Sequence, residues 1–330
     1  MDQTTASHTL LKDIDGTEYG HALKAKYFNL HRNYCNLNHG SFGTIAKPVS
    51  EAQIQLCLDQ ESRPDRWFRE TYFKHVDRAR DVIAELVNAN AEDIVLVENA
   101  SSAINSILRT MGLQKGDKVL RLSNAYPMVI HTLNWLVSTV GIEVVVVNVE
   151  YPVKGPEQLV DAVSEALKAN PGVKLCIFSH IASIPTMIEP VELLTPLAHS
   201  HNALVILDGA HCPGVLDLNL RELNPDYYLG NLHKWIFAPK GTAFMYVRNT
   251  PERDLIPQPT VISSTGENEY LNRFRYTGTR DYTAFTAIPA AVDFLKTLGG
   301  LKQIQQYNHS LAVAAARHLA SVWNTSLLVS

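Results

Sequence analysis

Short apolar runs alternate with longer segments of helical periodicity over most of the chain beyond about residue 90. The predicted strands are Ile94–Val97, Lys118–Leu122, Glu143–Val149, Leu175–Ser179, Ala203–Leu207 and Thr242–Val247. The predicted helices between them are Ser102–Met111, Tyr126–Val140, Pro156–Ala169 and Val191–His199. Nearly all-apolar strands that alternate with helices are typical of a parallel sheet covered by helices on both faces. The pattern therefore predicts an α/β fold.

The two ends of the chain differ from this middle part. Residues 1–25 are polar and unpatterned, which predicts a mobile N-terminal lead. A stretch that contains prolines, 251–259, closes the alternation, and a helix-like pattern follows from Tyr282. We therefore expect a large domain over residues 26–260 and the start of a small domain over residues 261–330.

Charge and composition exclude several classes of protein. A formal net charge of -4, with no Lys/Arg-rich block, argues against a nucleic-acid partner, which would need a basic face. Aliphatic runs such as Val144–Val147 are far too short to cross a bilayer, and the N-terminus has neither region of a secretory signal. The four cysteines form no CxxC pair. These observations predict a cytoplasmic protein with reduced thiols and no membrane partner.

Ligands of parallel α/β sheets bind beyond the carboxyl ends of the strands. Polar or aromatic residues follow four of the predicted strands at that position, over 98–102, 124–126, 179–180 and 208–211. No G-x-G-x-x-G follows a strand, and no G-x-x-x-x-G-K-[ST] occurs. Any phosphate that this edge binds is therefore held by a different kind of loop.

Asp208 ends the apolar run Ala203–Leu207 and precedes Gly209, Ala210 and His211. A carboxylate at the end of a buried strand is costly unless a cation or hydrogen bonds compensate it. The alternative is an aspartate that caps the following turn, which is common in α/β proteins. Asp208 taken alone leaves both interpretations open.

Lys234 lies between His233 and Trp235, shortly after the apolar residues 227–229. Desolvation lowers the pKa of a lysine and frees its amine to attack a carbonyl. The alternative is a surface lysine whose stem lies along apolar residues. The order of Asp208 and then Lys234 favours a cofactor that forms a Schiff base.

The segments 208–211 (DGAH) and 231–235 (NLHKW) together resemble the class V aminotransferase family of fold-type I pyridoxal-phosphate enzymes. The segments 37–43 (LNHGSFG), 99–105 (NASSAIN) and 276–281 (YTGTRD) are most similar to its isopenicillin N epimerase-like and cysteine desulfhydrase branch. The resemblance implies a mostly parallel sheet with helices on both faces, a small α+β domain, a pyridoxal-phosphate cofactor and a small amino-acid-like substrate.

The same resemblance assigns roles to matching positions. Lys234 would hold the cofactor through a Schiff base and later move the Cα proton. Asp208 would pair with the pyridine nitrogen, so that the ring accepts carbanion charge. His211 would contact the phenolic oxygen of the ring, and Tyr126 would stack on the ring.

The resemblance also implies a phosphate site and a shared subunit interface. The residues at a helix N-terminus that would hold the phosphate are Ala100, Ser101 and Ser102. Asn231 and His233 match positions that contact the same phosphate. Thr279 matches a residue that reaches the phosphate of a neighbouring subunit, which implies a homodimer.

The substrate residues leave more alternatives open. Asn38, His39 and Ser41 lie in a glycine-flanked loop, which is either a substrate loop or a plain turn. Arg280 would clamp a substrate carboxylate or else pair with Asp281. His180, after its strand, is similarly ambiguous. His199 and His201 lack further ligands at metal spacing, so we expect surface residues at a helix end and no metal site.

The resemblance implies chemistry at the α carbon of an amino acid. We expect a C–S lyase similar to cysteine desulfhydrases, with an epimerase or an aminotransferase as alternatives. Family members continue beyond the position of Ser330, and their further segment contributes a substrate-binding arginine. The sequence is therefore also compatible with a fragment or a shortened form, including a non-catalytic paralogue that binds the cofactor or pairs with another subunit.

Overall fold

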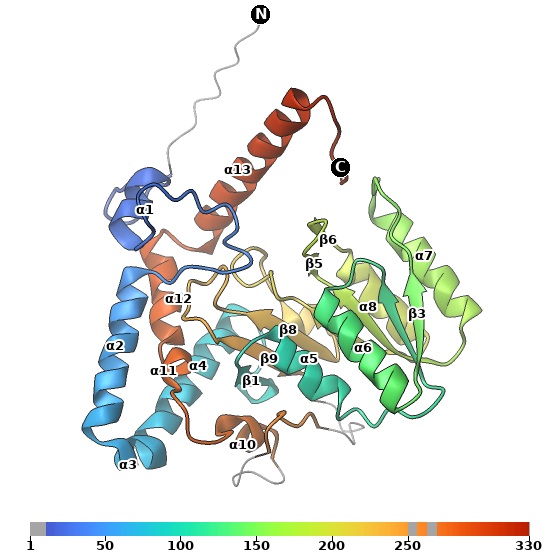
Figure 1. The fold of residues 1–330 in the computed structure, drawn as a ribbon, viewed down its shortest axis with the longest axis horizontal. Coiled ribbons are helices and arrows are strands. Elements are labelled where there is room, and N and C mark those ends of the chain that lie inside the picture. The colour runs from blue at the N-terminus through green and yellow to red at the C-terminus, as the bar shows by residue number, and fades with distance from the viewer. Residues whose placement is uncertain (1–10, 250–255, 263–268, 330) are drawn as a thin grey trace, which may run out of the picture.

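The computed structural model describes residues 11–249, 256–262 and 269–329, and its centre is a seven-stranded sheet (Figure 1). The strands are β1 Ile94–Val97, β2 Lys118–Leu122, β3 Glu143–Val147, β4 Val173–Ser179, β7 Leu204–Asp208, β8 Tyr227–Asn231 and β9 Ala243–Val247. Their order is β1-β9-β8-β7-β4-β2-β3. A separate hairpin pairs β5 (Ile181–Ala182) with β6 (Met187–Ile188).

All pairings between β8, β7, β4, β2 and β3 are parallel, whereas β9 runs antiparallel to both β8 and β1. The mostly parallel sheet is thus confirmed, with β9 as its exception within the described residues. All six predicted strands agree with the structure to within two residues at each end; Glu143–Val149, for example, ends two residues early, at Val147. The strand β8 was not predicted.

Some of the helices begin at starting signals in the sequence. They are α1 His21–Tyr27, α2 Lys47–Ser62, α3 Pro64–Arg66, α4 Tyr72–Leu86, α5 Ala100–Leu108, α6 Pro127–Thr139, α7 Pro156–Ala169, α8 Val191–Ser200, α9 Leu220–Leu223, α10 Tyr270–Arg275, α11 Thr283–Thr286, α12 Ile288–Thr297 and α13 Leu301–Val322, with short π and 3-10 turns at Trp67–Thr71 and Ala91–Asp93. Proline is the first residue of α6 and of α7, where its missing N–H leaves no hydrogen bond unmade.

Successive residues of each strand enter two separate cores, because side chains alternate across a sheet. Ile94, Leu96 and Val205 pack into one core with α4, α7 and α8. Val95 and Ile206 pack into the other with α5 and α6, which lie together in front of the sheet in Figure 1. The expected α/β fold with helices on both faces is therefore confirmed.

The helix α13 extends away from this body (Figure 1). Its buried residue is Ile304, and its outer part exposes Leu311, Leu319 and Val322. Within the described residues no single helix is long and apolar enough to cross a membrane, and Thr283–Thr297 with Leu301–Val322 meets that test only as a pair bent by 71°. The proposed domain boundary near residue 260 stays a prediction.

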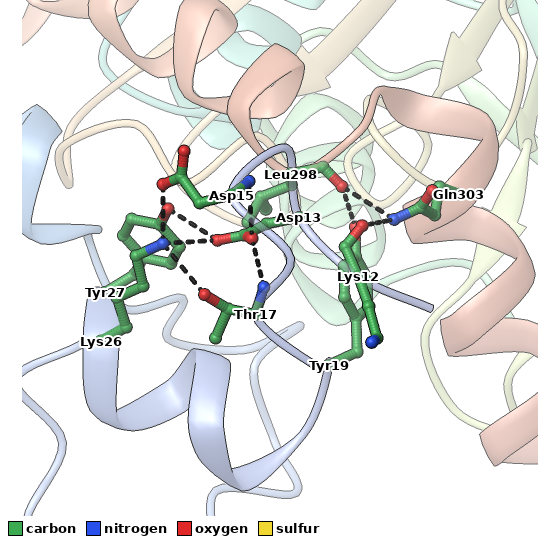
Figure 2. Close-up of polar contacts among 9 residues, drawn as sticks. All are labelled: Lys12, Asp13, Asp15, Thr17, Tyr19, Lys26, Tyr27, Leu298 and Gln303. Carbon is green, nitrogen blue, oxygen red and sulfur yellow. Dashed lines mark hydrogen bonds and ion pairs between the residues drawn. The ribbon is translucent and has the colours of Figure 1, made fainter. Parts of the chain in front are cut away.

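An N-terminal clasp, residues 11–19, fastens the start of the described chain to the junction of α12 and α13 (Figure 2). Its centre is the Asp13 carboxylate, whose side chain is fully buried. The carboxylate accepts hydrogen bonds from Thr17 N at 2.7 Å, Asp15 N at 3.0 Å, Lys26 Nζ at 2.8 Å and Tyr27 Oη at 2.8 Å. Burial alone would raise the pKa of Asp13, but these hydrogen bonds outweigh it and hold the pKa well below its usual range.

We expect Asp13→Asn to lower the melting temperature near neutral pH, because the amide loses the ion pair with Lys26. The pKa of Asp13 is lower in the folded chain than its ordinary value of 3.8, so its stabilisation is present above that value and is lost as the pH falls below it. Melting curves of variant and wild type should therefore converge in acid. Asp15→Asn, at an exposed partner of the same lysine, is the control and should change little. Equal effects of both substitutions would contradict a central role for Asp13.

Candidate functional site

A cavity of about 240 Å³ lies at the carboxyl ends of the parallel strands. Its lining includes these residues predicted from the sequence: Ser41, Ala100, Ser101, Tyr126, Asp208, His211, Asn231, His233 and Lys234. Predicted residues outside the lining are Asn38, His39, Ser102, Thr279 and Arg280. The structure thus gathers most of the predicted cofactor residues around one space. The role of each residue stays a prediction.

The amine of Lys234, beyond the end of β8, lies 3.0 Å from Nε2 of His211. Desolvation lowers the pKa of Lys234, and the nearby Asp208 charge opposes this shift. Burial, aided by the lysine charge, lowers the pKa of His211 to about 4. His211 is therefore neutral near pH 7, and its Nε2 can accept a hydrogen bond from the lysine amine. The pair presents a desolvated nitrogen nucleophile to the cavity.

The Asp208 carboxylate forms the floor of the cavity at the end of β7 and is 5% exposed. Burial raises its pKa, whereas the hydrogen bond from Ala210 N, at 3.1 Å, and the charge of Lys234 act in the opposite direction. Among the described residues, Ala210 N is the hydrogen-bond donor to this side chain. The second carboxylate oxygen is thus available to a ring N–H in the cavity, which suits a protonated pyridine nitrogen.

The N-terminus of α5 supplies an anion site at the rim of the cavity. Asn99 caps the helix by accepting Ser102 N at 2.9 Å, and Asn231 Oδ1 accepts Ala100 N at 2.9 Å. These two bonds use the backbone N–H groups of Ala100 and Ser102. In the first turn of α5, the backbone N–H and the hydroxyl of Ser101 are therefore the donors that remain for a ligand in the cavity. A helix N-terminus with unpaired N–H groups favours a phosphate. Ser102 lies beside a smaller adjacent cavity and hydrogen-bonds to Asn99.

The segment 37–43 packs directly against the chain around Lys234. His39 Nε2 donates to the Lys234 carbonyl oxygen at 2.8 Å, and the His39 ring packs against Trp235. A Cβ on Gly43 would approach the His233 carbonyl oxygen to 2.3 Å, so only glycine permits this contact. Ser41 lines the cavity, whereas Asn38 is exposed and its carbonyl accepts Ser41 N at 3.2 Å. The segment is therefore a packed wall of the site.

Two further predicted residues line the cavity from other sides. Tyr126 precedes α6 and is 46% exposed, so its ring is free to cover a bound ligand. His233 Nδ1 donates to the Thr242 carbonyl at 2.7 Å, which fixes the ring and leaves Nε2 for a ligand. These positions are compatible with the roles that the resemblance implied.

Arg280 and Thr279 lie outside the cavity in this chain. Arg280 pairs with Glu98 at 2.8 Å and stacks over Tyr282, with its guanidinium 4.2 Å from the ring centroid. Among the described residues Glu98, and not the alternative partner Asp281, forms the ion pair with Arg280, while the Asp281 carboxylate accepts Thr283 N. Thr279 is exposed, and its hydroxyl hydrogen-bonds to Tyr276. Neither residue contacts Lys234 or Asp208 within one subunit.

The histidines that seemed ambiguous have structural partners. His199 is not a plain surface residue, because its Nε2 lies 2.9 Å from the buried Asp226, which also pairs with Arg248. His180 Nδ1 lies 3.0 Å from the Tyr228 hydroxyl, directly behind the turn after Asp208. Within the described part of the chain, no three histidine, cysteine or acidic side chains form a metal-binding group.

Sequence reasoning missed two buried polar residues behind the cavity, Tyr228 and Glu189. Tyr228 packs so closely under Gly209 that a Cβ there would lie 2.1 Å from the tyrosine hydroxyl. Glu189 is fully buried between Ser179 and Asn124. Tyr228 lies in an apolar run, and Glu189 is a single charged residue before a proline, so neither carries a signal of its own.

The residues around the cavity fit pyridoxal phosphate. The amine of Lys234 suits its aldehyde, the buried Asp208 carboxylate suits its ring nitrogen, and the N-terminus of α5 suits its phosphate. These three groups lie on separate elements of one cavity, which the sheet brings together.

Comparisons with known proteins agree with this interpretation. The family model described as aminotransferase class-V matches residues 60–330. Hercynylcysteine sulfoxide lyase of Schizosaccharomyces pombe is 27% identical over 321 residues, which cover 94% of this chain and 80% of that protein. L-cysteine desulfhydrase of Arabidopsis thaliana is 30% identical over 305 residues, which cover 88% of this chain and 67% of that protein.

A solved structure supports the fold. A variant of the C–S lyase C-DES, with glycine covalently linked to its pyridoxal-phosphate cofactor, has a TM-score of 0.75 at 18% identity. The match covers 89% of this chain and 77% of that one. The predicted family, fold and cofactor are confirmed. The chain therefore belongs to the aminotransferase class-V family of pyridoxal-phosphate enzymes.

Proposed function

We propose that this chain is a C–S lyase that acts on cysteine or on an S-substituted cysteine. The observation that carries the proposal is the desolvated Lys234 amine, which shares one cavity with the neutral His211 and the buried Asp208. Relatives named L-cysteine desulfhydrase and hercynylcysteine sulfoxide lyase match nearly the whole chain, and both names describe cleavage of a carbon–sulfur bond.

Bound pyridoxal phosphate supplies a carbonyl for the substrate amine and a ring that accepts electrons from Cα. Lys234 then acts as the base that takes the Cα proton, because its desolvated amine is easily neutral. His211, 3.0 Å from that amine, orients it. Asp208 holds a negative charge on the cavity floor, which stabilises a proton on the ring nitrogen.

Loss of the Cα proton prepares elimination at the β carbon. The Cβ–S bond breaks, sulfur leaves with the bonding electrons as a thiolate, and water later hydrolyses the remaining enamine. For cysteine the balanced reaction consumes one water and gives sulfide, pyruvate and ammonia. Ser41 and Ser183 are among the residues with hydroxyl groups that line the cavity and could contact the substrate.

We expect the purified, cofactor-loaded chain to release sulfide and pyruvate in equal amounts from L-cysteine. S-substituted cysteines should give the corresponding thiol and pyruvate. Sulfide assay with methylene blue and coupled detection of pyruvate measure the two products separately. Cα exchange with solvent deuterium without sulfide or thiol release would contradict the lyase.

The other outcomes identify the alternatives. Inversion at Cα without β-elimination would assign an epimerase, and formation of a keto acid with an aminated cofactor would assign an aminotransferase. A chain that binds the cofactor but performs none of these reactions would be the non-catalytic paralogue. The intact set of Lys234, Asp208 and His211 favours catalysis.

We further propose a cytoplasmic homodimer. The exposed Thr279, beside an open groove lined by Phe68, Phe73 and Tyr276, supports a role toward a neighbouring subunit. A two-fold interface would place the same residue in both composite sites. Sedimentation velocity of the cofactor-loaded chain measures the assembly, and a fully active monomer would contradict the shared site. Imaging of a tagged chain in its own cells tests the location.

A further inference from the structure

Glu189 is a fully buried carboxylate that the proposed chemistry does not use. It follows β6, and its side chain has two neighbours at hydrogen-bond distance. Ser179 N donates to Oε2 at 2.9 Å, and the amide of Asn124 lies 3.1 Å from Oε1. No lysine, arginine or histidine of the described residues pairs with it.

These contacts place Glu189 at the junction of three segments. Ser179 ends β4 and lines the cavity. Asn124 lies after β2, two residues before the cavity residue Tyr126. The backbone N–H of Glu189 also donates to the His180 carbonyl at 3.2 Å, which closes the base of the β5–β6 hairpin. Glu189 therefore joins three parts of a single cavity wall, two through its side chain and one through its backbone, and it is not among the residues that line the cavity.

The surroundings of Glu189 favour its neutral form. Burial raises its pKa to about 8, and hydrogen bonds from Asn124 and Ser179 only partly oppose this. The titratable groups that face it are Asp208, whose charge repels a second carboxylate, and the Tyr151 phenol. Two neighbouring buried carboxylates repel each other, so only one of them is expected to be charged. Asp208 lines the cavity and Glu189 does not, so the negative charge is expected on Asp208.

The amide of Asn124 provides the matching acceptor. As placed, its Nδ2 faces Glu189, and its buried Oδ1 has no partner among the described atoms. The two ends of an asparagine amide are assigned from such networks and are interchangeable in shape. With the amide turned, a protonated Glu189 donates to Oδ1 and still accepts Ser179 N, so both bonds persist without a buried charge.

We propose that Glu189 is a positioning residue that, as a neutral carboxylic acid, fixes the loop before Tyr126 to the end of β4. In this state Asp208 is the single negative charge on the cavity wall. The assignment concerns the cofactor site and is independent of which substrate the chain cleaves.

The first test uses the cofactor-free full chain and Glu189→Gln. Glutamine has one acceptor and one donor end, as the neutral acid does, but does not titrate. A difference infrared spectrum near pH 7 should show the carbonyl band of a protonated carboxylic acid in the wild type and not in the variant. Absence of that band from the wild type would overturn the proposal.

The pH dependence of stability supplies a second measurement. A glutamate with a pKa raised from 4.5 to about 8 on folding loses its stabilisation as the pH rises between these values. The melting temperature of Glu189→Gln minus that of the wild type should therefore increase as the pH rises from 4.5 to about 8. Above about pH 8 this difference should stay constant. Glu192→Gln, at an exposed glutamate three residues later, is the matched control and should show no such trend. A constant difference for Glu189→Gln would overturn the proposal.

Hydrogen exchange tests the positioning role. In Glu189→Ala, the amides of Ser179 and of residues 123–126 should exchange about fivefold faster or more, since each buried hydrogen bond is worth about 1 kcal/mol. Glu189→Gln should retain slow exchange. Wild-type exchange rates in the alanine variant would overturn the role, whatever the activity of the enzyme.

Discussion

Lys234→Ala should abolish the covalent attachment of pyridoxal phosphate and reduce turnover by several orders of magnitude. In the proposed mechanism, the substitution removes both the nitrogen that forms the Schiff base and the base that moves the Cα proton. No other described lysine lines the cavity, so none can replace it. Wild-type protein should be yellow and, after borohydride reduction, carry the cofactor on the peptide that contains residue 234.

Lys240→Ala is the control for this experiment. Lys240 is exposed, is not among the residues that line the cavity, and donates its amine hydrogen to the Gly43 carbonyl at 3.0 Å. Reduction should still label Lys234 in this variant. Labelling of any other lysine in the wild type would show that Lys234 has been assigned wrongly.

Asp208→Asn should leave cofactor binding largely intact and slow Cα deprotonation by about three orders of magnitude, which is about 4 kcal/mol of barrier. A neutral amide cannot keep the ring nitrogen protonated, whereas Lys234 and the N-terminus of α5 still hold the cofactor. The rate is measured as exchange of the substrate Cα hydrogen with deuterium, which does not depend on the later elimination.

Asp217→Asn changes an exposed carboxylate nine residues later and should leave this exchange unchanged. If Asp208→Asn exchanged Cα hydrogen at the wild-type rate, Asp208 would have no part in stabilising the carbanion. Loss of cofactor binding in that variant would instead make Asp208 an anchoring residue.

The apolar runs predicted most of the sheet because its central strands are buried on both faces. The run Ala203–Leu207 matches β7 with a shift of one residue, and 94–97 matches β1 at both ends. The strand β8 was not predicted because its last two residues, Gly230 and Asn231, are types that strands disfavour. The antiparallel direction of β9 could not be predicted from the sequence, because the side chains of a strand alternate in the same way in both directions.

The candidate site followed from strand ends because a parallel sheet brings them together. That rule located Asp208 and the turn before α5 without knowledge of any contact. Lys234 was recognised instead from its neighbours His233 and Trp235 and the apolar residues 227–229 before them. The rule could not foresee the partner of Arg280, because Glu98 lies far away in the sequence. It also missed Glu189, because a glutamate before a proline resembles any exposed turn until its burial is seen.

The clasp around Asp13 has a consequence for the order of folding during synthesis. The Tyr19 hydroxyl donates to the Leu298 carbonyl, 279 residues later, and Gln303 donates to the Lys12 carbonyl. No ribosome-bound chain can complete these bonds before residue 303 has emerged. The entropic cost of bringing the two ends of the chain together grows only slowly with the number of residues between them. This cost is small enough for the N-terminal residues to dock once the sheet between the two ends has folded. Docking of the N-terminal residues is therefore expected among the last steps of folding, after the cofactor cavity has been built.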